Sequence, residues 1–240
     1  MVEPSSRYED IKIPLSESVH GMEEVSAVLG VPRWWPTGSR VSVVMAHGAG
    51  ADMNDPAIVG VHRELTERRY LSLRFNFPFA EAGKRKVDEM PVLRRALRAA
   101  ISALGRDPTA APAHLFLGGV GMGSQVAADL ASSRVRVDGL FLAGYPLHPA
   151  SNPEELQPEQ LFRIVSPALF LQGDRDKFCD VDALRRTLTR VGAPTILKVI
   201  QEADHKFKVL KKSGRTPEEV YEQMSNALDE WIQALLGGTA

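Results

Sequence analysis

Residues 114–127 read HLFLGGVGMGSQVA, and this stretch decides the fold that we expect. An apolar run of strand length, 114–117, leads into a turn that carries Gly119, Gly121 and Gly123. A helical period follows at 123–132, with no linker between the turn and the helix. A buried strand, a tight glycine turn and a helix form the repeating unit of a parallel sheet that is covered by helices.

The rest of the chain repeats this alternation on both sides of the glycine turn. Apolar runs of strand length lie at 41–46, 71–75, 139–143, 168–172 and 196–200, and helical periods lie near 56–69, 90–104, 180–191 and 217–236. Alternating apolar and polar residues at 8–14 and 24–31 predict two antiparallel strands at a sheet edge. The sequence therefore predicts one α/β domain over 1–240, with a mostly parallel sheet of about eight strands and helices on both faces.

The glycine turn has the spacing of a nucleophile elbow, G-x-S-x-G, in which a serine projects from a strained strand-to-helix turn. Gly119 and Gly123 fill the flanking positions, but Gly121 stands where the serine belongs. A close-packed turn is the plain alternative. A phosphate-binding loop fits less well, because the lysine of a P-loop is absent and the dinucleotide pattern counted from Gly121 meets Val126 instead of glycine.

Two further residues strengthen the elbow interpretation. Asp176 follows the run 168–172, and His205 follows the run 196–200. In nucleophile-elbow enzymes the chain order is nucleophile, acid, histidine, with the last two on loops after successive strands. An aspartate in such a loop is often only a helix cap and a lone histidine is often structural, but their joint placement predicts a catalytic dyad beside position 121.

The strand-end loops supply the other candidate site residues. The run 41–46 opens into His-Gly-Ala-Gly-Ala at 47–51, where the backbone amide of Ala49 could join that of Met122 in an oxyanion hole. The irregular stretches 76–89 and 145–158 also follow strand ends, where open α/β sheets gather binding groups. We expect substrate contacts from five side chains, with loop capping or a place at the core edge as the alternative: Asn54, Asn76, Phe79, Tyr145 and His148.

Together these segments resemble the dienelactone-hydrolase-like α/β hydrolases. The resemblance is closest to the branch that contains testis-expressed protein thirty and the third regulatory subunit of the NSL histone-acetyltransferase complex. It covers nearly the whole chain and is carried by residues 47–50, 52–54, 74–79, 118–124, 144–149, 161–164 and 203–205. It implies the α/β-hydrolase fold. It also implies that Ser124 belongs to the family pattern, so that only Gly121 departs from it.

Glycine cannot form an acyl-enzyme, so the retained acid and histidine leave three explanations open. The chain could be an ester, thioester or lactone hydrolase whose serine has been replaced. It could instead be a natural pseudoenzyme that binds a ligand or a protein, or a protein in which the Asp176–His205 dyad acts as a general base without a covalent nucleophile. The stretch 145–158 is too short for a sizeable cap domain, so we expect an open pocket.

The amino-acid composition limits the classes of partner that we expect. Lysine and arginine total 29 against 30 acidic residues, and this balance gives no basic field that attracts nucleic acid or a membrane surface. The N-terminus lacks a signal-peptide pattern, so we expect a soluble cytoplasmic protein. The single cysteine, Cys179, argues against a thiolate metal site, and no cofactor is implied. Trp34 and Trp35 suggest a packed hairpin or a homodimer contact, and the expected ligand is a small ester, thioester or lactone.

Overall fold

The computed structural model describes residues 5–33, 35, 40–106, 111–133 and 135–237. Its eight strands form one sheet in the order β1-β2-β4-β3-β5-β6-β7-β8. The strands are β1 (Arg7–Val19), β2 (Met22–Val31), β3 (Val41–Ala46), β4 (Leu71–Phe75), β5 (His114–Val120), β6 (Gly139–Ala143), β7 (Ala168–Gly173) and β8 (Thr195–Ile200). The pairs from β4 to β8 are parallel, and only β1–β2 and β2–β4 are antiparallel.

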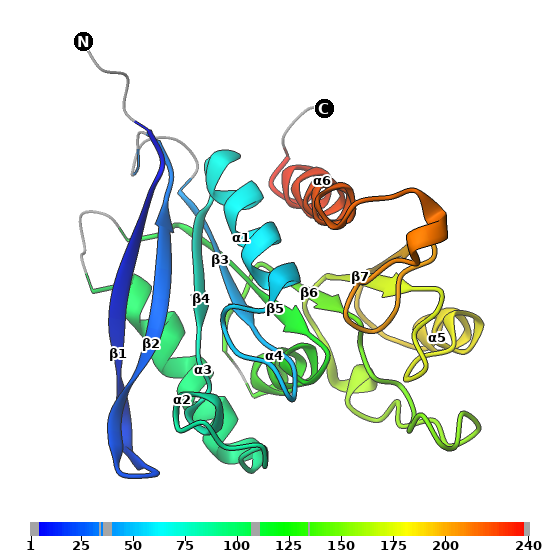
Figure 1. The fold of residues 1–240 in the computed structure, drawn as a ribbon, viewed down its shortest axis with the longest axis horizontal. Helices are drawn as coiled ribbons and strands as arrows, with labels where there is room; N and C mark the ends of the chain where they lie inside the picture. Colours follow the sequence, from blue (N-terminus) through cyan, green and yellow to red (C-terminus); the bar gives the residue numbers. More distant parts are fainter. Residues whose placement is uncertain (1–4, 34, 36–39, 107–110, 134, 238–240) are drawn as a thin grey trace.

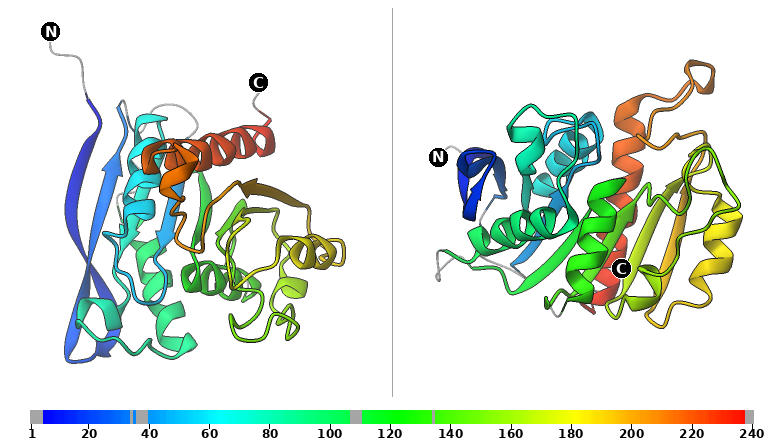
Figure 2. Two further views of the ribbon diagram at one scale, coloured as in Figure 1. Left: turned by 45° about the vertical axis from the view of Figure 1, so that its right-hand side comes forward. Right: turned by 90° about the horizontal axis from the view of Figure 1, so that it is seen from below.

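The first two strands form a long hairpin at one edge of the sheet (Figures 1 and 2). His20 and Gly21 connect them, and both have positive φ angles, 55° and 80°. Two consecutive residues with positive φ give the turn a twist that matches the right-handed twist of the strands, as in the two-residue turns that hairpins favour. Pro14 lies in β1, where the missing N–H costs little because β1 is an edge strand.

Helices cover both faces of the sheet. They are α1 (Pro56–Glu67), α2 (Pro78–Glu81), α3 (Met90–Leu104), α4 (Met122–Ser132), α5 (Val181–Leu188) and α6 (Pro217–Leu235). The apolar faces of α3, α4 and α5 belong to one buried core, and those of α1 and α6 belong to the core on the opposite face. Strands buried on both faces explain the continuous apolar runs in the sequence.

The expected α/β-hydrolase fold is confirmed. All eight strands overlap the runs expected from the sequence. β1 continues five residues beyond 14, to Val19, and β5 continues three residues beyond 117, to the glycine turn. The helix α2, which begins at Pro78, lies in a stretch that we expected to be irregular. Between β6 and β7 the described chain forms only a one-turn helix, Leu161–Arg163, so no sizeable cap is present there. Trp35 packs against the core, and Trp34 lies outside the described residues.

A buried histidine gives the fold a pH dependence. The His62 side chain, on α1, is 1% exposed, and its Nε2 lies 3.2 Å from the Ser72 carbonyl oxygen. Burial, with a smaller contribution from the Arg74 charge, lowers the pKa of His62 from its ordinary value to about 4. The folded protein therefore resists a proton that the unfolded chain accepts below about pH 6.5.

We expect the free energy of unfolding to fall by about 2 kcal/mol between pH 8 and pH 5 on account of His62. The sign follows from the depressed pKa, because stability is complete above the unfolded pKa and declines as the pH falls toward the folded one. Urea unfolding at several pH values measures the effect. The His62→Gln variant should have a shallower pH dependence over this range, and an unchanged slope would contradict the assignment.

Candidate active site

The glycine turn joins β5 to α4 at the carboxyl edge of the sheet. Gly121 connects the two elements with φ 57° and ψ −120°, a backbone conformation that side chains rarely adopt. Its amide donates a hydrogen bond to the Ala143 carbonyl oxygen at the end of β6, at 2.9 Å. The turn is thus fixed to the neighbouring strand, and whatever stands at position 121 is held in a defined place.

The flanking glycines are required by a close approach of the backbone. A Cβ atom on Gly119 would lie 2.3 Å from the Ala46 carbonyl oxygen, and a Cβ on Gly123 would lie 2.2 Å from the same oxygen. Ala46 is the last residue of β3, so this strand end passes directly against the turn. The G-x-x-x-G spacing at 119–123 therefore has a steric cause in this fold.

Asp176 lies in the loop after β7, and its side chain is fully buried. Three donors converge on the carboxylate. The Gln172 side-chain amide and His205 Nδ1 reach Oδ2 at 2.7 and 2.8 Å, and the Phe178 backbone amide reaches Oδ1 at 2.8 Å. The three contacts fix the orientation of the carboxylate behind the histidine.

His205 is presented by a tight turn after β8. The Asp204 carboxylate accepts hydrogen bonds from the Lys206 and Lys208 amides at 2.8 and 2.9 Å, which closes the turn around the histidine. The Phe178 ring lies 4.6 Å from the imidazole, centroid to centroid, and supports one side of it. The imidazole remains 24% exposed, so a small molecule can reach it from solvent.

The imidazole and the glycine turn converge. A Cβ atom built on Gly121 would lie 2.9 Å from His205 Nε2. Because Nδ1 donates to Asp176, a neutral imidazole presents the lone pair of Nε2 toward position 121. The structure thus brings together the three positions that the sequence predicted, with the acid behind the histidine and the histidine facing the turn.

The two amides expected to form an oxyanion hole flank the same space. Met122 is the first residue of α4, so its N–H has no acceptor within the helix. Neither this amide nor that of Ala49 has a hydrogen-bond acceptor among the described residues. The loop after β3 lies close by, since Gly48 Cα is 3.9 Å from a Cβ built on Gly121. An oxyanion hole formed by Ala49 and Met122 stays a prediction.

The part of the chain that carries the turn and the dyad matches a known protein family. Residues 39–233 match the family described as alpha/beta hydrolase domain. The chain belongs to this family. The match covers the sheet from β3 onward together with the glycine turn, Asp176 and His205.

Solved structures of α/β hydrolases share the architecture. A dienelactone hydrolase from Anabaena variabilis is 18% identical with a TM-score of 0.74, and the match covers 96% of this chain and 99% of that one. An alpha-beta serine hydrolase homologue from Coxiella burnetii is 20% identical, with a TM-score of 0.71 and coverage of 92% and 97%. A serine hydrolase without lid from Xanthomonas campestris is 18% identical, with a TM-score of 0.70 and coverage of 95% and 97%. At these identities the likeness shows the fold.

The five side chains expected to touch a substrate of this α/β hydrolase have structural partners instead. Asn54 accepts a hydrogen bond from Arg74 of β4, and Asn76 donates one to Glu81 of α2. Phe79 and Tyr145 are each only 1% exposed and lie in the core. His148 accepts a hydrogen bond from the Asp180 amide at 2.9 Å. None of these contacts points to a ligand, and substrate binding by these residues stays a prediction.

Neither Ser124 nor Cys179 is placed to act as a nucleophile at the turn. Ser124 is fully buried, and its hydroxyl donates to the Gly121 carbonyl oxygen at 2.5 Å. Cys179 is 2% exposed, and burial, followed by the nearby Asp176 charge, raises the pKa of its thiol. Both side chains therefore serve the packing of the elbow and the acid loop.

Three residues around the dyad were missed from the sequence: Gln172, Phe178 and Asp204. Only Gln172 left a signal, as a polar residue at the end of an apolar strand. Among the described residues, no group of three or more His, Cys, Asp or Glu side chains is placed to hold a metal ion. Within the same part of the chain, no helix has the length and apolar character needed to cross a membrane.

Proposed function

We propose that this α/β hydrolase is a carboxylic ester hydrolase disarmed at its nucleophile, with Asp176 and His205 retained. One observation carries the proposal: a side chain at position 121 would begin 2.9 Å from His205 Nε2, whose other ring nitrogen is bonded to Asp176. A histidine backed by an aspartate and aimed at a strained turn is the arrangement that activates a serine hydroxyl. The protein as it stands lacks the hydroxyl and cannot form an acyl-enzyme.

The proposed ligands are small esters, thioesters or lactones. One structural relative is named as a dienelactone hydrolase and another as a serine hydrolase without lid. The connection between β6 and β7 contains only a one-turn helix, so we expect an open site here too. We place the chain in the branch with testis-expressed protein thirty and the third NSL regulatory subunit. We further propose that residues 1–240 form one domain and that the protein is cytoplasmic. We propose no nucleic-acid or membrane partner, and a homodimer or another protein partner stays open.

Two other functions remain candidates. The dyad is intact and Nε2 faces an unfilled position, so His205 could take a proton from a water molecule and act as a general base. The protein could instead be a pseudoenzyme that only binds its ligand. Such a protein does not need an intact dyad, and a glycine at position 121 would not impair its binding function. A cleft beside His205, with apolar walls that include Leu210 and Tyr221, favours this binding function over the general base.

Labelling by a fluorophosphonate probe tests the proposal. We expect no labelling of the unchanged protein and covalent labelling of the Gly121→Ser variant, because only the variant has a hydroxyl for the dyad to activate. Mass spectrometry should place the adduct on residue 121. The matched control, Gly121→Ser combined with His205→Ala, keeps the hydroxyl but removes its base, and it should label far more slowly.

The outcomes separate the candidates. Histidine-dependent labelling supports the disarmed hydrolase. A folded Gly121→Ser variant that neither labels nor hydrolyses esters would overturn that proposal and leave the binding function. Histidine-dependent ester hydrolysis by the unchanged protein would instead support the general base.

A further inference from the structure

A second candidate site lies beside the dyad, between α1, α6 and the loop that carries His205. A cleft of about 500 Å³ opens there, which is within the usual size range of small-molecule sites. It begins at Lys206, one residue after the histidine, and is bounded by the first residues of α1 and α6. Its apolar walls come from three separate segments of the chain: Pro56, Ala57, Val209, Leu210, Pro217 and Tyr221.

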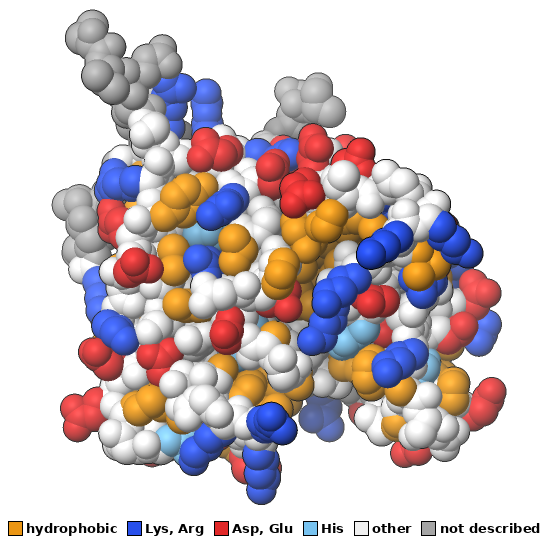
Figure 3. All heavy atoms as spheres, viewed as in Figure 1, with side chains coloured by type: hydrophobic (Ala, Val, Ile, Leu, Met, Phe, Trp, Pro, Cys, Tyr) orange, Lys and Arg blue, Asp and Glu red, His pale blue; other side chains and the backbone are white. Residues whose placement is uncertain are grey.

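Positive charge surrounds one side of this cleft. Four cationic side chains line it, Lys206, Lys208, Lys211 and Arg215, against the two carboxylates of Asp55 and Glu218. The three lysine ammonium groups form no ion pair with any residue that the structure describes. In Figure 3, hydrophobic side chains gather between α1 and the segment before α6, with Lys and Arg side chains beside them.

Arg215 is held in place although its charge is not neutralised. Its guanidinium donates hydrogen bonds to the Gln201 carbonyl oxygen at 3.0 Å and to the Gln223 side-chain oxygen at 2.6 Å. Both partners are uncharged. A fixed guanidinium and three unpaired lysines next to apolar walls form a surface that prefers an anion with an apolar body.

We propose that this cleft binds a small amphipathic carboxylate, with the apolar body against Leu210 and Tyr221 and the anionic group beside the lysines. The two carboxylates of the cleft set the orientation. Asp55 and Glu218 line the cleft together with Tyr221, and their negative charges contribute, after burial, to the raised pKa of Tyr221. An anion is therefore disfavoured at the tyrosine end. The head group therefore lies at the end formed by Lys206, Lys208 and Lys211.

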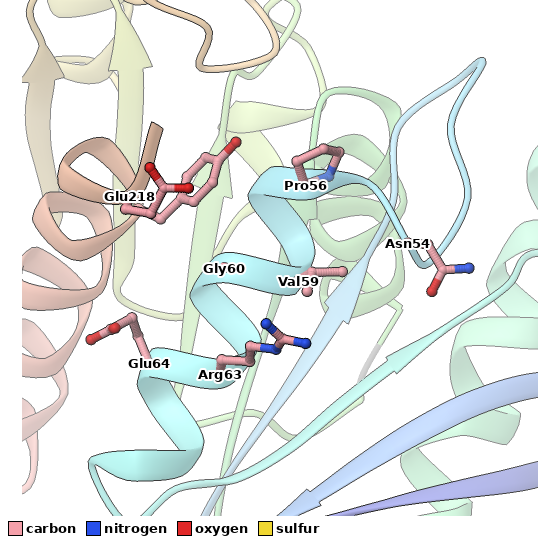
Figure 4. Close-up of a pocket in the computed structure, with 8 residues that line it drawn as sticks. Asn54, Pro56, Val59, Gly60, Arg63, Glu64 and Glu218 are labelled. Carbon is pink, nitrogen blue, oxygen red and sulfur yellow. The ribbon is translucent and has the colours of Figure 1, made fainter. Parts of the chain in front are cut away.

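The cleft has room for a longer apolar body. A neighbouring groove of about 350 Å³ between α1 and α6 shares Pro56, Glu218 and Tyr221 with it. Figure 4 shows this groove, with Pro56 and Val59 on α1 and Glu218 on the facing end of α6. Gly60 lets the Tyr221 ring lie against α1, because a Cβ there would come within 2.3 Å of the ring. A chain of carbon atoms could extend past the tyrosine into the groove.

Isothermal titration of the unchanged protein with decanoate tests the inference. We expect saturable binding with a Kd below about 1 mM at low salt, and weaker binding as salt is raised. Two further probes test the contributions of the anionic head group and the apolar body separately. Acetate has the same head group without the body, and decylammonium has the same body with the opposite charge. Both should bind at least about tenfold more weakly than decanoate.

Matched double variants locate the site. Lys208→Ala with Lys211→Ala removes two charges from the cleft and should raise the Kd for decanoate about tenfold. Lys198→Ala with Lys212→Ala removes two exposed lysines that do not line the cleft, so its Kd should stay within about twofold. All four side chains are exposed, so neither variant should disturb folding.

The inference fails if the two double variants bind decanoate equally, or if decylammonium binds as well as decanoate. An anionic lipid surface is the other source of an amphipathic anion, and sedimentation with phosphatidylglycerol vesicles tests for binding to it. Binding to vesicles without binding to free decanoate would assign the lysines to a membrane surface and overturn the proposal. These measurements use the protein with Gly121 in place, so their failure leaves the labelling result at position 121 unaffected.

Discussion

The Gly121→Ser variant should hydrolyse p-nitrophenyl acetate with a kcat/KM at least about 10³-fold above that of the unchanged protein. The new Oγ would extend from a Cβ that already lies 2.9 Å from His205 Nε2, so a small withdrawal of the imidazole brings the two groups into hydrogen-bond distance. The Ala49 and Met122 amides would stabilise the oxyanion if they take the role that we predict for them. Initial rates over a range of substrate concentrations measure the effect.

The gain should depend on both members of the dyad. Adding Asp176→Asn to Gly121→Ser should lower kcat by about 10⁴-fold, because the asparagine no longer holds the imidazole in the productive tautomer. Gly121→Ala adds a Cβ without a hydroxyl and should give no activity. Equal rates for the serine and alanine variants would show that any hydrolysis arises elsewhere on the protein.

A serine at position 121 should also make the protein less stable. The turn has φ 57° and ψ −120°, and a side chain in such a region costs about 1–3 kcal/mol. Glycine relieves that strain and leaves the imidazole undisturbed. In the disarmed hydrolase that we propose, Gly121 therefore exchanges covalent catalysis for a more stable turn.

Much of the fold and the dyad could be predicted because each rests on local chemistry. Strands buried on both faces must be apolar throughout, so the run 41–46 coincides with β3. Parallel strands bring their carboxyl ends to one edge, so Asp176 and His205 could be placed together from chain order alone. The helix α2 was missed because Phe77, the residue before it, gives no side-chain cap and the helix spans only four residues.

Contacts that depend on the path of a loop, or on how separate segments pack together, could not be predicted. The support of Asp176 by Gln172 follows from how the loop after β7 turns back on the strand, and the sequence does not specify that path. The five expected substrate contacts stay predictions for a related reason. A polar side chain on a loop can bind another loop as readily as a ligand, as Asn76 does when it accepts a hydrogen bond from the Met53 amide. The lysine-lined cleft needs α1, α6 and the histidine loop to meet, and only coordinates show that they do.

The Gly123→Ala variant should fail to fold, or should lose more than about 4 kcal/mol of stability. Its Cβ would lie 2.2 Å from the Ala46 carbonyl oxygen and 2.7 Å from that of His47, and neither oxygen is free to move. Ala46 is fully buried and is paired with Phe75 on one side and Gly119 on the other, so relief would require β3 to leave the sheet. Soluble yield and the urea midpoint measure the loss.

Gly192→Ala is the matched control, since a Cβ there meets nothing within 4 Å, and it should leave the midpoint nearly unchanged. A Gly123→Ala protein with the original midpoint would mean that the elbow is not pressed against β3, and the reason for two glycines around position 121 would have to be sought in function instead of packing.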